Sequence, residues 1–393
     1  MKRPLLLIAG AALTALALAG CASPAPAGDA PAPGAATAPS TEGPRVAVAY
    51  AGGVLVLDGE TLEVLADAPS EDFVRLNLAG DDRHAFVSTS QGFQLLDLRE
   101  PALTDLVVEA AAAGHVVRHA GRTVLYDDAT SDTTVFETDA LAAVGDALPP
   151  AEVVEGAQAH HGVSVVLSDG SLLTTVGDAT ARSGIRVTDA AGTEIAASAE
   201  CPGVHGEGTA AGEAVVVGCE DGALVYRDGT ITKLASPDAF GRIGNAYVAE
   251  DSPLVVMDYK DDPDAEGYLL HRLALVDTAA LTLEVVDLPG DVSYTWRGVV
   301  RSADGDALLL GADGDVHVID PASGEIVASH PAIEPWESPT EWQQEHPAIA
   351  VAGDTVYVTD SAQRRIVALD ARTGEQLAAA DLPVTPNEIV ALD

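Results

Sequence analysis

The chain has 393 residues, with 20 Lys and Arg against 61 Asp and Glu, which gives a formal net charge of −41. A surface this acidic repels nucleic acid phosphates and anionic lipid headgroups and concentrates cations, so nucleic acid is excluded as a partner. Acidity by itself does not indicate a metal site, because it also serves solubility.

The first 21 residues are predicted to be a lipoprotein signal peptide. Lys2 and Arg3 give a positive start, residues 4–19 are apolar, and the following Leu-Ala-Gly-Cys sequence ending at Cys21 resembles a lipobox. The apolar stretch is too short to be a preferred transmembrane anchor. We therefore expect export, lipidation of Cys21 and attachment to the extracytoplasmic face of a membrane in the cell envelope. An ordinary signal peptide with an incidental cysteine is the alternative.

Residues 22–44 contain almost only Ala, Pro, Gly, Ser and Thr, and they predict a flexible tether because they cannot build a core. Residues 45–393 form the one predicted domain. It is a run of short β-branched strands broken by Gly/Asp turns, with no sustained helical period.

The domain repeats one unit of about 45 residues, which is the length of a four-stranded propeller blade. The first strands of successive units begin near Val74, His115, His161, His205, Gly244, Trp296 and His346. Three strands precede the first complete unit, and one spare strand ends the chain at residues 387–393. The sequence therefore predicts an all-β fold, a single β-propeller of eight blades whose C-terminal strand completes the N-terminal blade. Seven blades are the alternative.

Cys201 and Cys219 bracket one predicted strand–turn–strand, so their side chains could meet across the open end of the hairpin. In an exported protein a disulfide is the expected state of such a pair. A zinc site of mixed Cys and His ligands is the alternative, although the cysteine spacing is unlike that of a zinc finger.

Three histidines, His115, His161 and His205, stand at the starts of first strands in the third, fourth and fifth predicted blades. The innermost strands of a propeller line its channel, so these side chains are expected to meet at one mouth. Neutral imidazoles that converge can hold zinc. Copper and nickel would also suit such donors. The alternative is that each histidine only forms hydrogen bonds within its own blade.

Four further residues are candidate ligands at this mouth. His119 lies four residues beyond His115 and, by strand alternation, on the same side. His160 and His161 point to opposite sides, so only one of them can face the channel. Glu207 shares a face with His205, and His346 stands at the start of the eighth blade.

Two other segments have weaker signals. Residues 258–267 carry alternating aspartates but lack the glycine and glutamate spacing of an EF-hand, so a solvated turn is predicted there. The long loop 331–347, with Trp336 and Trp342, is expected to cover a mouth, contact a partner or fill a groove. No nucleophile elbow, phosphate loop or dinucleotide fingerprint is present, and no catalytic residue is predicted.

At the histidine segments the chain resembles the AztD family of periplasmic zinc metallochaperones. The resemblance lies in residues 114–136, in "AHHGVSVVLSDGSLL" (159–173) and in 201–225 with its cysteine pair. It implies a β-propeller that binds Zn²⁺ through histidines, here His115 or His119 with His161 and His205, completed by a carboxylate or His346. The family often carries a His/Asp-rich stretch near its mature N-terminus, and this chain departs from it because residues 22–44 hold no histidine.

The resemblance also implies a partner, the solute-binding protein of a zinc ABC importer, to which zinc is passed directly. The predicted function is thus a cell-envelope zinc metallochaperone and not an enzyme. Two other functions stay open from the residues alone. One is a metal-free propeller scaffold for protein binding, and the other is a metal-assisted, lactonase-like hydrolase that uses the same histidines.

Overall fold

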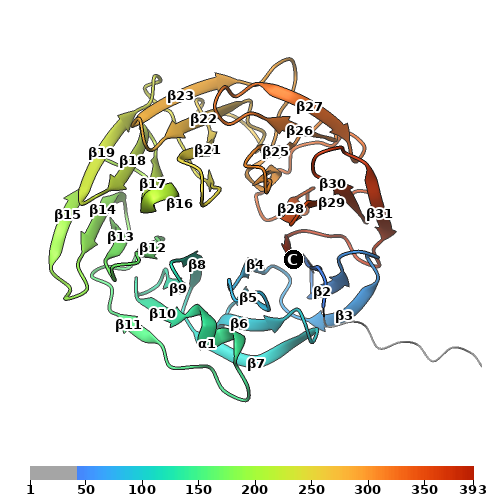
Figure 1. The fold of residues 1–393 in the computed structure, drawn as a ribbon, viewed down its shortest axis with the longest axis horizontal. Coiled ribbons are helices and arrows are strands. Elements are labelled where there is room, and N and C mark those ends of the chain that lie inside the picture. The colour runs from blue at the N-terminus through green and yellow to red at the C-terminus, as the bar shows by residue number, and fades with distance from the viewer. Residues whose placement is uncertain (1–41) are drawn as a thin grey trace, which may run out of the picture. The chain divides into compact units, whose positions relative to one another are not determined.

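Residues 42–393 are described by the computed structural model, and they form eight four-stranded sheets arranged in a ring (Figure 1). Each sheet is one blade, with its first strand nearest the centre and its fourth at the rim. The predicted all-β propeller of eight blades is confirmed, and the alternative of seven is wrong. The predicted signal peptide, Cys21 and nearly all of the predicted tether lie outside the described residues.

The blades follow one another along the chain. From the centre outward, blade one consists of β32 (Ile389–Leu392), β1 (Arg45–Tyr50), β2 (Gly53–Asp58) and β3 (Val64–Pro69), and blade two of β4 (Arg75–Leu78), β5 (His84–Thr89), β6 (Gly92–Asp97) and β7 (Ala102–Glu109). Blade three consists of β8 (Ala113–His119), β9 (Arg122–Asp127), β10 (Thr133–Glu137) and β11 (Glu152–Val154), and blade four of β12 (Ser164–Val166), β13 (Leu172–Gly177), β14 (Arg182–Thr188) and β15 (Glu194–Ser198).

Blade five consists of β16 (His205–Ala210), β17 (Ala214–Cys219), β18 (Gly222–Arg227) and β19 (Thr230–Ala235), and blade six of β20 (Ala246–Tyr247), β21 (Leu254–Tyr259), β22 (Arg272–Asp277) and β23 (Thr282–Asp287). Blade seven consists of β24 (Val299–Arg301), β25 (Ala307–Leu310), β26 (Asp315–Ile319) and β27 (Ile326–Pro331), and blade eight of β28 (Ile349–Ala352), β29 (Thr355–Asp360), β30 (Arg365–Asp370) and β31 (Gln376–Asp381). The helices in the described part are short: α1 (Thr138–Ala142), η1 (Ala211–Glu213) and η2 (Trp296–Gly298). None of them is long and apolar enough to span a membrane.

The ring is closed by the C-terminal strand. β32 pairs antiparallel with β1, with Leu392 opposite Arg45 and Ile389 opposite Val48, and it forms the innermost strand of blade one. The predicted closure is therefore confirmed. Because the C-terminal strand supplies the first strand that blade one otherwise lacks, all eight blades have four strands and the inner edge of β1 is paired.

The cores lie between neighbouring blades, because the second and third strands are buried on both faces. Between blades eight and one, for example, Leu55 and Leu57 of β2 pack in the same cluster as Tyr357 and Ile366. Complete burial of each such aliphatic side chain contributes about 1.5–3 kcal/mol. The outermost strands alternate instead: β3 has the burial pattern of a strand with one wet face.

Loop 331–347 lies over part of one mouth. The ring of Trp342 meets that of Phe73 edge-on, with centroids 5.3 Å apart. The Arg75 guanidinium lies 4.9 Å from the centroid of Trp296 and 5.9 Å from that of Trp342. Since Phe73 and Arg75 lead into blade two and Trp296 into blade seven, the loop extends past the first strands of blades eight and one. These contacts agree with the predicted role of covering a mouth, and the Trp336 indole, which donates to the Gly311 carbonyl, also packs against blade seven.

Candidate metal centre

The first strands of blades three, four and five bring three histidines together. His205 is the first residue of β16, His115 is the third residue of β8, and His161 lies three residues before β12. One ring nitrogen from each of the three lies within 4.8 Å of the other two. The ring centroids are 5.0 to 5.2 Å apart. We call this group the histidine cluster, and the mouth at which the innermost strands begin the histidine mouth.

Two of the cluster nitrogens, the Nε2 atoms of His161 and His205, face each other. His161 donates its Nδ1 proton to Asp128 Oδ2 at 2.6 Å, and His205 donates its Nδ1 proton to the carbonyl of Gly244. A neutral imidazole has one N–H, so both Nε2 atoms present lone pairs when both rings are neutral, whereas a protonated ring would donate its Nε2–H to the other. These two atoms are only 2.9 Å apart. Between two neutral rings the facing lone pairs repel, and a cation held between them removes that repulsion.

His115 completes the cluster from the neighbouring blade. Its Nδ1 lies 3.4 Å from Glu207 Oε2, and its side chain is 24% exposed. A bulge in β16 separates Glu207 from His205, at Gly206 with φ of 64°. A Cβ at Gly206 would lie 2.5 Å from the backbone of Gly244, so only glycine allows this close approach. The bulge lets His205 reach Gly244 and Glu207 reach His115.

Burial keeps His205 in its metal-binding form. Burial lowers the pKa of His205 well below its usual value, and the neighbouring His115 lowers this pKa further. The hydrogen bond to Gly244 opposes the shift but is the smaller effect. His205 is therefore neutral at physiological pH, as an imidazole must be to bind a metal ion.

His160 is separated from the cluster by the direction of its side chain. It is buried, with Nδ1 2.8 Å from the Gln158 carbonyl and 3.0 Å from Ser131 Oγ, and Nε2 3.0 Å from Thr175 Oγ1. Of the adjacent pair, His161 is thus the residue that faces the other histidines. His160 has the contacts of a structural histidine.

His119 does not join His115. Its Nε2 lies 2.8 Å from Glu213 Oε1, and the same carboxylate accepts hydrogen bonds from the backbone and hydroxyl of Ser168. Strand alternation does place His119 on the side of His115. Four residues of rise, however, separate their Cα atoms by roughly 13 Å along the strand. His119 therefore lies at the other end of the channel.

His346 lies in blade eight, across the histidine mouth from the cluster. It is 3% exposed, and Nδ1 lies 2.7 Å from the Gln344 carbonyl. Burial lowers its pKa to about 4, and nearby Arg297 lowers it in the same direction. Within residues 42–393, its contacts are with the Gln344 carbonyl and the Trp336 ring and not with another histidine or a cysteine.

The buried His346 makes the metal-free protein less stable in acid. Its folded pKa lies below the ordinary value of 6.5, so the unfolded chain binds the proton first as the pH falls. We expect the free energy of unfolding to decrease from pH 6.5 to about pH 4, by up to about 1.4 kcal/mol per pH unit. Urea unfolding of the protein and of His346→Gln at several pH values tests this. Equal pH slopes for the two proteins would contradict it.

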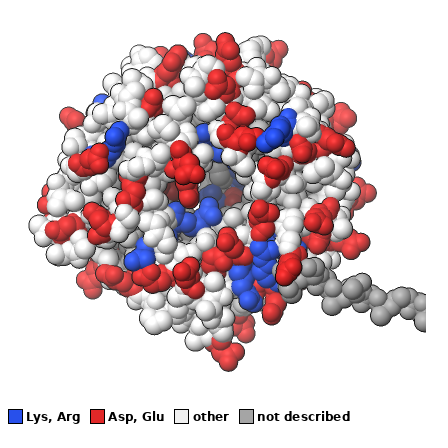
Figure 2. Space-filling view, in the orientation of Figure 1, with Lys and Arg blue, Asp and Glu red and all other residues white. Residues whose placement is uncertain are grey.

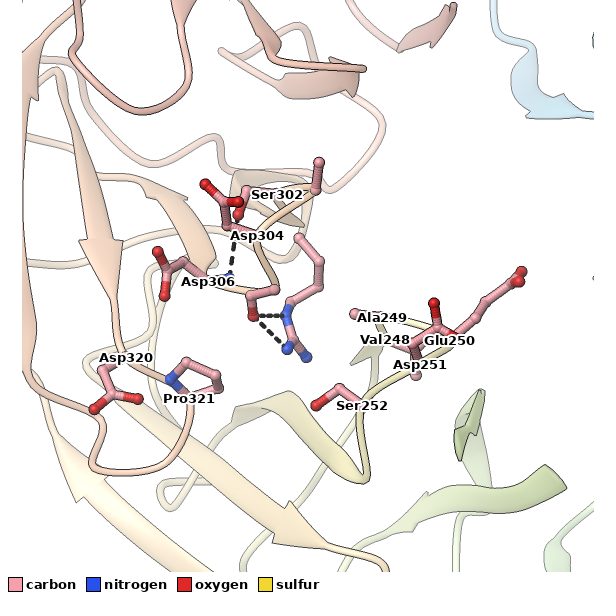
Figure 3. Close-up of a pocket in the computed structure, with 13 residues that line it drawn as sticks. Val248, Ala249, Glu250, Asp251, Ser252, Ser302, Asp304, Asp306, Asp320 and Pro321 are labelled. Carbon is pink, nitrogen blue, oxygen red and sulfur yellow. Dashed lines mark hydrogen bonds between the residues drawn. The ribbon is translucent and has the colours of Figure 1, made fainter. Parts of the chain in front are cut away.

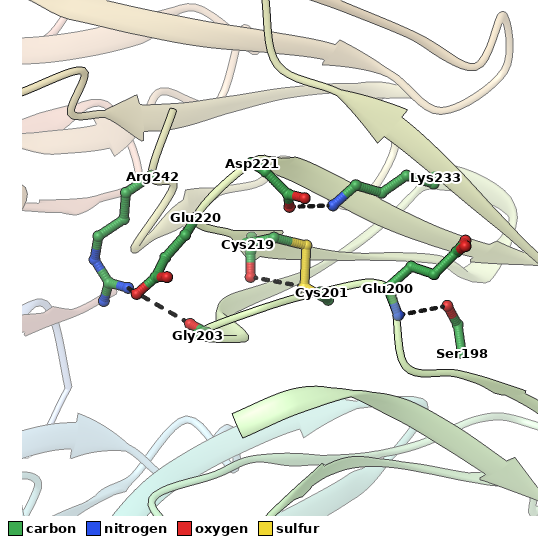
Figure 4. The surroundings of a disulfide bond; sticks show 10 residues. Ser198, Glu200, Cys201, Gly203, Cys219, Glu220, Asp221, Lys233 and Arg242 are labelled. Atoms are coloured by element: carbon green, nitrogen blue, oxygen red, sulfur yellow. Dashed lines mark hydrogen bonds and ion pairs between the residues drawn. A yellow bond between two sulfur atoms is a disulfide. The ribbon is translucent and has the colours of Figure 1, made fainter. Parts of the chain in front are cut away.

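Cys201 and Cys219 form a disulfide next to the cluster (Figure 4). Both cysteines are fully buried, and their Cα atoms are 4.9 Å apart. Cys201 precedes β16 and Cys219 ends β17, so the predicted bridge across the hairpin is confirmed. The backbone of Gly203 also accepts a hydrogen bond from Arg242, at 3.5 Å. The segment that leads to His205 is thus held at Cys201 and at Gly203.

An acidic hollow of about 590 Å³ lies elsewhere, between blades six and seven (Figure 3). Glu250, Asp304, Asp306 and Asp320 are among the residues that line it. Its buried Arg301 donates hydrogen bonds to the Gly305 carbonyl. No histidine lines this hollow. Over residues 42–393, the histidine cluster is the one group of three or more His, Cys, Asp or Glu whose ligand atoms converge closely enough for a metal ion.

Asp128 is a residue of the site that the sequence analysis did not find. It follows β9, in the turn that leads to β10. Because β8 runs away from the histidine mouth and β9 runs back, this turn returns to the same mouth as His115. The pair Asp127-Asp128 in that turn was the available signal.

Fold and site together define an eight-bladed β-propeller with a three-imidazole cluster at one mouth of its channel. No family model matches the chain. It is 27% identical over 302 residues to the zinc chaperone AztD of Citrobacter koseri, a match that covers 76% of this chain and 69% of AztD. This relative is named as a chaperone and not as an enzyme, in agreement with the prediction of a non-catalytic protein.

Two solved structures of Citrobacter koseri AztD, one of them apo, share this fold. Their TM-scores are 0.74 and 0.72, at 23% and 22% identity, over 88% of this chain and 97% of each AztD chain. The resemblance to AztD that the histidine segments indicated is therefore confirmed, and it extends over most of the propeller.

Proposed function

We propose that this protein is a zinc chaperone of the cell envelope, which binds one Zn²⁺ through His115, His161 and His205 and passes it to the solute-binding protein of a zinc ABC importer. The observation that carries the proposal is the 2.9 Å separation of two Nε2 atoms whose Nδ1 protons are both donated elsewhere. The chaperone name of the AztD relative supports the role.

The cluster has dimensions that suit zinc. Zn–N bonds of 2.0–2.1 Å in a tetrahedral shell place neighbouring nitrogens roughly 3.3 Å apart. The nitrogens of His161 and His205 need to separate by only a few tenths of an ångström from 2.9 Å to reach this value. Three histidines leave a fourth position for water, for Glu207 or for an incoming ligand.

The cluster is also exposed enough to release its cargo. The side chain of His161 is 45% exposed, and that of His115 is 24% exposed. A receiving protein can therefore approach the metal and replace these ligands one at a time. A fully buried site with four protein ligands would hold zinc for longer and release it more slowly.

The acidic surface and the predicted lipoprotein signal peptide support this role. Figure 2 shows acidic side chains over much of one face, with few basic ones among them, and such a surface raises the local concentration of cations. We further propose that Cys21 is lipidated and holds the protein at the extracytoplasmic side of the membrane. The disulfide is of the kind that persists in an oxidising compartment.

Metal analysis and a transfer assay test the proposal. Protein purified without a histidine tag should contain about one zinc per chain and bind added zinc with a dissociation constant below a micromolar. Zinc-loaded protein, mixed with the importer's solute-binding protein and a strong chelator in excess, should deliver zinc to that protein. Absence of tight zinc binding would overturn the metal site. Complete capture of the zinc by the chelator would overturn direct delivery.

A further inference from the structure

Asp258 is a buried carboxylate that the metal cluster does not touch. It lies in β21 of blade six and is 5% exposed. Its Oδ1 accepts hydrogen bonds from the backbone N–H groups of Gly244, at 2.5 Å, and Asn245, at 2.9 Å. Its Oδ2 accepts one from the Asn245 side chain at 2.7 Å. Burial raises the pKa of Asp258, and the three donors that converge on its carboxylate oppose this rise and favour the charged form.

One peptide group connects Asp258 to the histidine cluster. The peptide between Gly244 and Asn245 donates its N–H to Asp258 and accepts the Nδ1 proton of His205 at its carbonyl. A negative charge at the N–H end of a peptide increases the negative charge on its carbonyl oxygen. Hydrogen bonds in such a chain strengthen one another. Asp258 thus strengthens the bond that fixes the tautomer of His205.

We propose that Asp258 is a positioning residue of the metal site, which acts through the Gly244–Asn245 peptide to hold His205 with its Nε2 lone pair towards the ion. The inference rests on the proposed function. With Asp258 included, each imidazole of the histidine cluster has a carboxylate partner. Asp128 contacts His161 directly, and Glu207 lies beside His115. The carboxylate of Asp258 differs from the other two because one peptide group separates it from its histidine, His205. Such outer partners of ligating histidines raise their basicity and set their orientation.

The variant Asp258→Asn tests the charge with little change of shape. The amide oxygen can still accept both backbone N–H groups, and the side chain of Asn245 can turn to present its own oxygen. Asp360→Asn is the matched control. Asp360 is also 5% exposed, lies at the end of the second strand of blade eight, and accepts a backbone hydrogen bond from Gln363.

Two measurements, zinc affinity and the His205 Nδ1 proton resonance, are made on the parent protein and the variants, and thermal unfolding confirms that each variant is folded. Zinc affinity, measured by chelator competition, is expected to fall about tenfold in Asp258→Asn and to stay within about twofold of the parent in Asp360→Asn. In the metal-free protein, the Nδ1 proton resonance of His205 is expected to move upfield in Asp258→Asn, because its hydrogen bond weakens. The resonance of His161, whose partner is Asp128, is expected to stay in place.

The outcomes separate this proposal from the proposed function. Unchanged zinc affinity in Asp258→Asn would overturn the positioning role, and so would a loss of affinity with an unmoved His205 resonance, which would indicate a general effect on packing. If the parent protein binds no zinc, the proposed function is wrong. The resonance of His205 in the metal-free protein then still decides whether Asp258 acts on that histidine.

Discussion

Zinc binding to the double variant His161→Ala/His205→Ala is expected to be at least about a hundredfold weaker than zinc binding to the parent protein. The two substitutions remove the facing Nε2 atoms and leave His115, with Glu207 beside it, as the remaining donors of the site. Loss of a partner behind a ligand already costs about 10–100-fold in metal affinity, so loss of two ligands costs more. Competition with a chromogenic chelator gives the measurement.

The matched control for this variant is His119→Ala/His346→Ala, which removes the same number of histidines from or next to the innermost strands of two other blades, three and eight. His119 is paired with Glu213 at the other end of the channel, and His346 lies buried in blade eight. Zinc affinity should stay within a few-fold of the parent. If this control lost zinc binding and His161→Ala/His205→Ala kept it, the ligands would lie outside the histidine cluster.

The sequence predicted the fold well because a propeller is specified by short-range signals. Alternating strands, Gly/Asp turns and a spacing of about 45 residues each depend on a few neighbouring residues. The predicted first strands begin within about three residues of the observed ones, as at His161 against Ser164 and at Trp296 against Val299. The closing strand followed from counting, because three initial strands without a fourth require one from elsewhere.

The metal site was predicted only in part. Equal spacing identified His115, His161 and His205, since equivalent positions in neighbouring blades must be neighbours in space. Alternation gave the side on which His119 lies but not its depth along the channel. His346 is equivalent in sequence to the cluster histidines, yet blade eight is too far around the ring from blades three to five for it to contact them.

Of the groups behind the ligands, the sequence analysis named Glu207 but neither Asp128 nor Asp258. Asp128 comes from a turn, and Gly244 comes from the connection between blades five and six. Their approach depends on loop conformation, in particular on the bulge at Gly206 that lets two backbones meet. Asp258 was assigned to a solvated acidic turn, whereas the structure places it inside β21. The choice between His160 and His161 likewise required the pocket formed by Ser131 and Thr175.

Removal of the disulfide is expected to affect stability and zinc affinity together. Cys201 and Cys219 are separated by 18 residues, and His205 lies within the loop that they close. Closing a loop of this length stabilises the folded state by about 3 kcal/mol, chiefly by restricting the unfolded chain. The variant Cys201→Ser/Cys219→Ser should lose about this much free energy of unfolding in urea. Zinc affinity should fall about tenfold, because the segment before His205 loses its covalent anchor and ordering it again costs conformational entropy.

The variant Cys201→Ala/Cys219→Ala distinguishes the bond from the burial of new hydroxyl groups. Both cysteines are fully buried, so serine adds a desolvation cost that alanine does not. A loss of zinc affinity in both variants would assign the effect to the bond. If both were destabilised and yet bound zinc like the parent, packing around Gly203 and its hydrogen bond from Arg242 would suffice to place His205. Excess zinc should restore part of the lost stability, since a ligand bound only by the folded state adds RT ln(1 + [L]/Kd) to it. That recovery would tie the order of the His205 segment to the occupancy of the cluster.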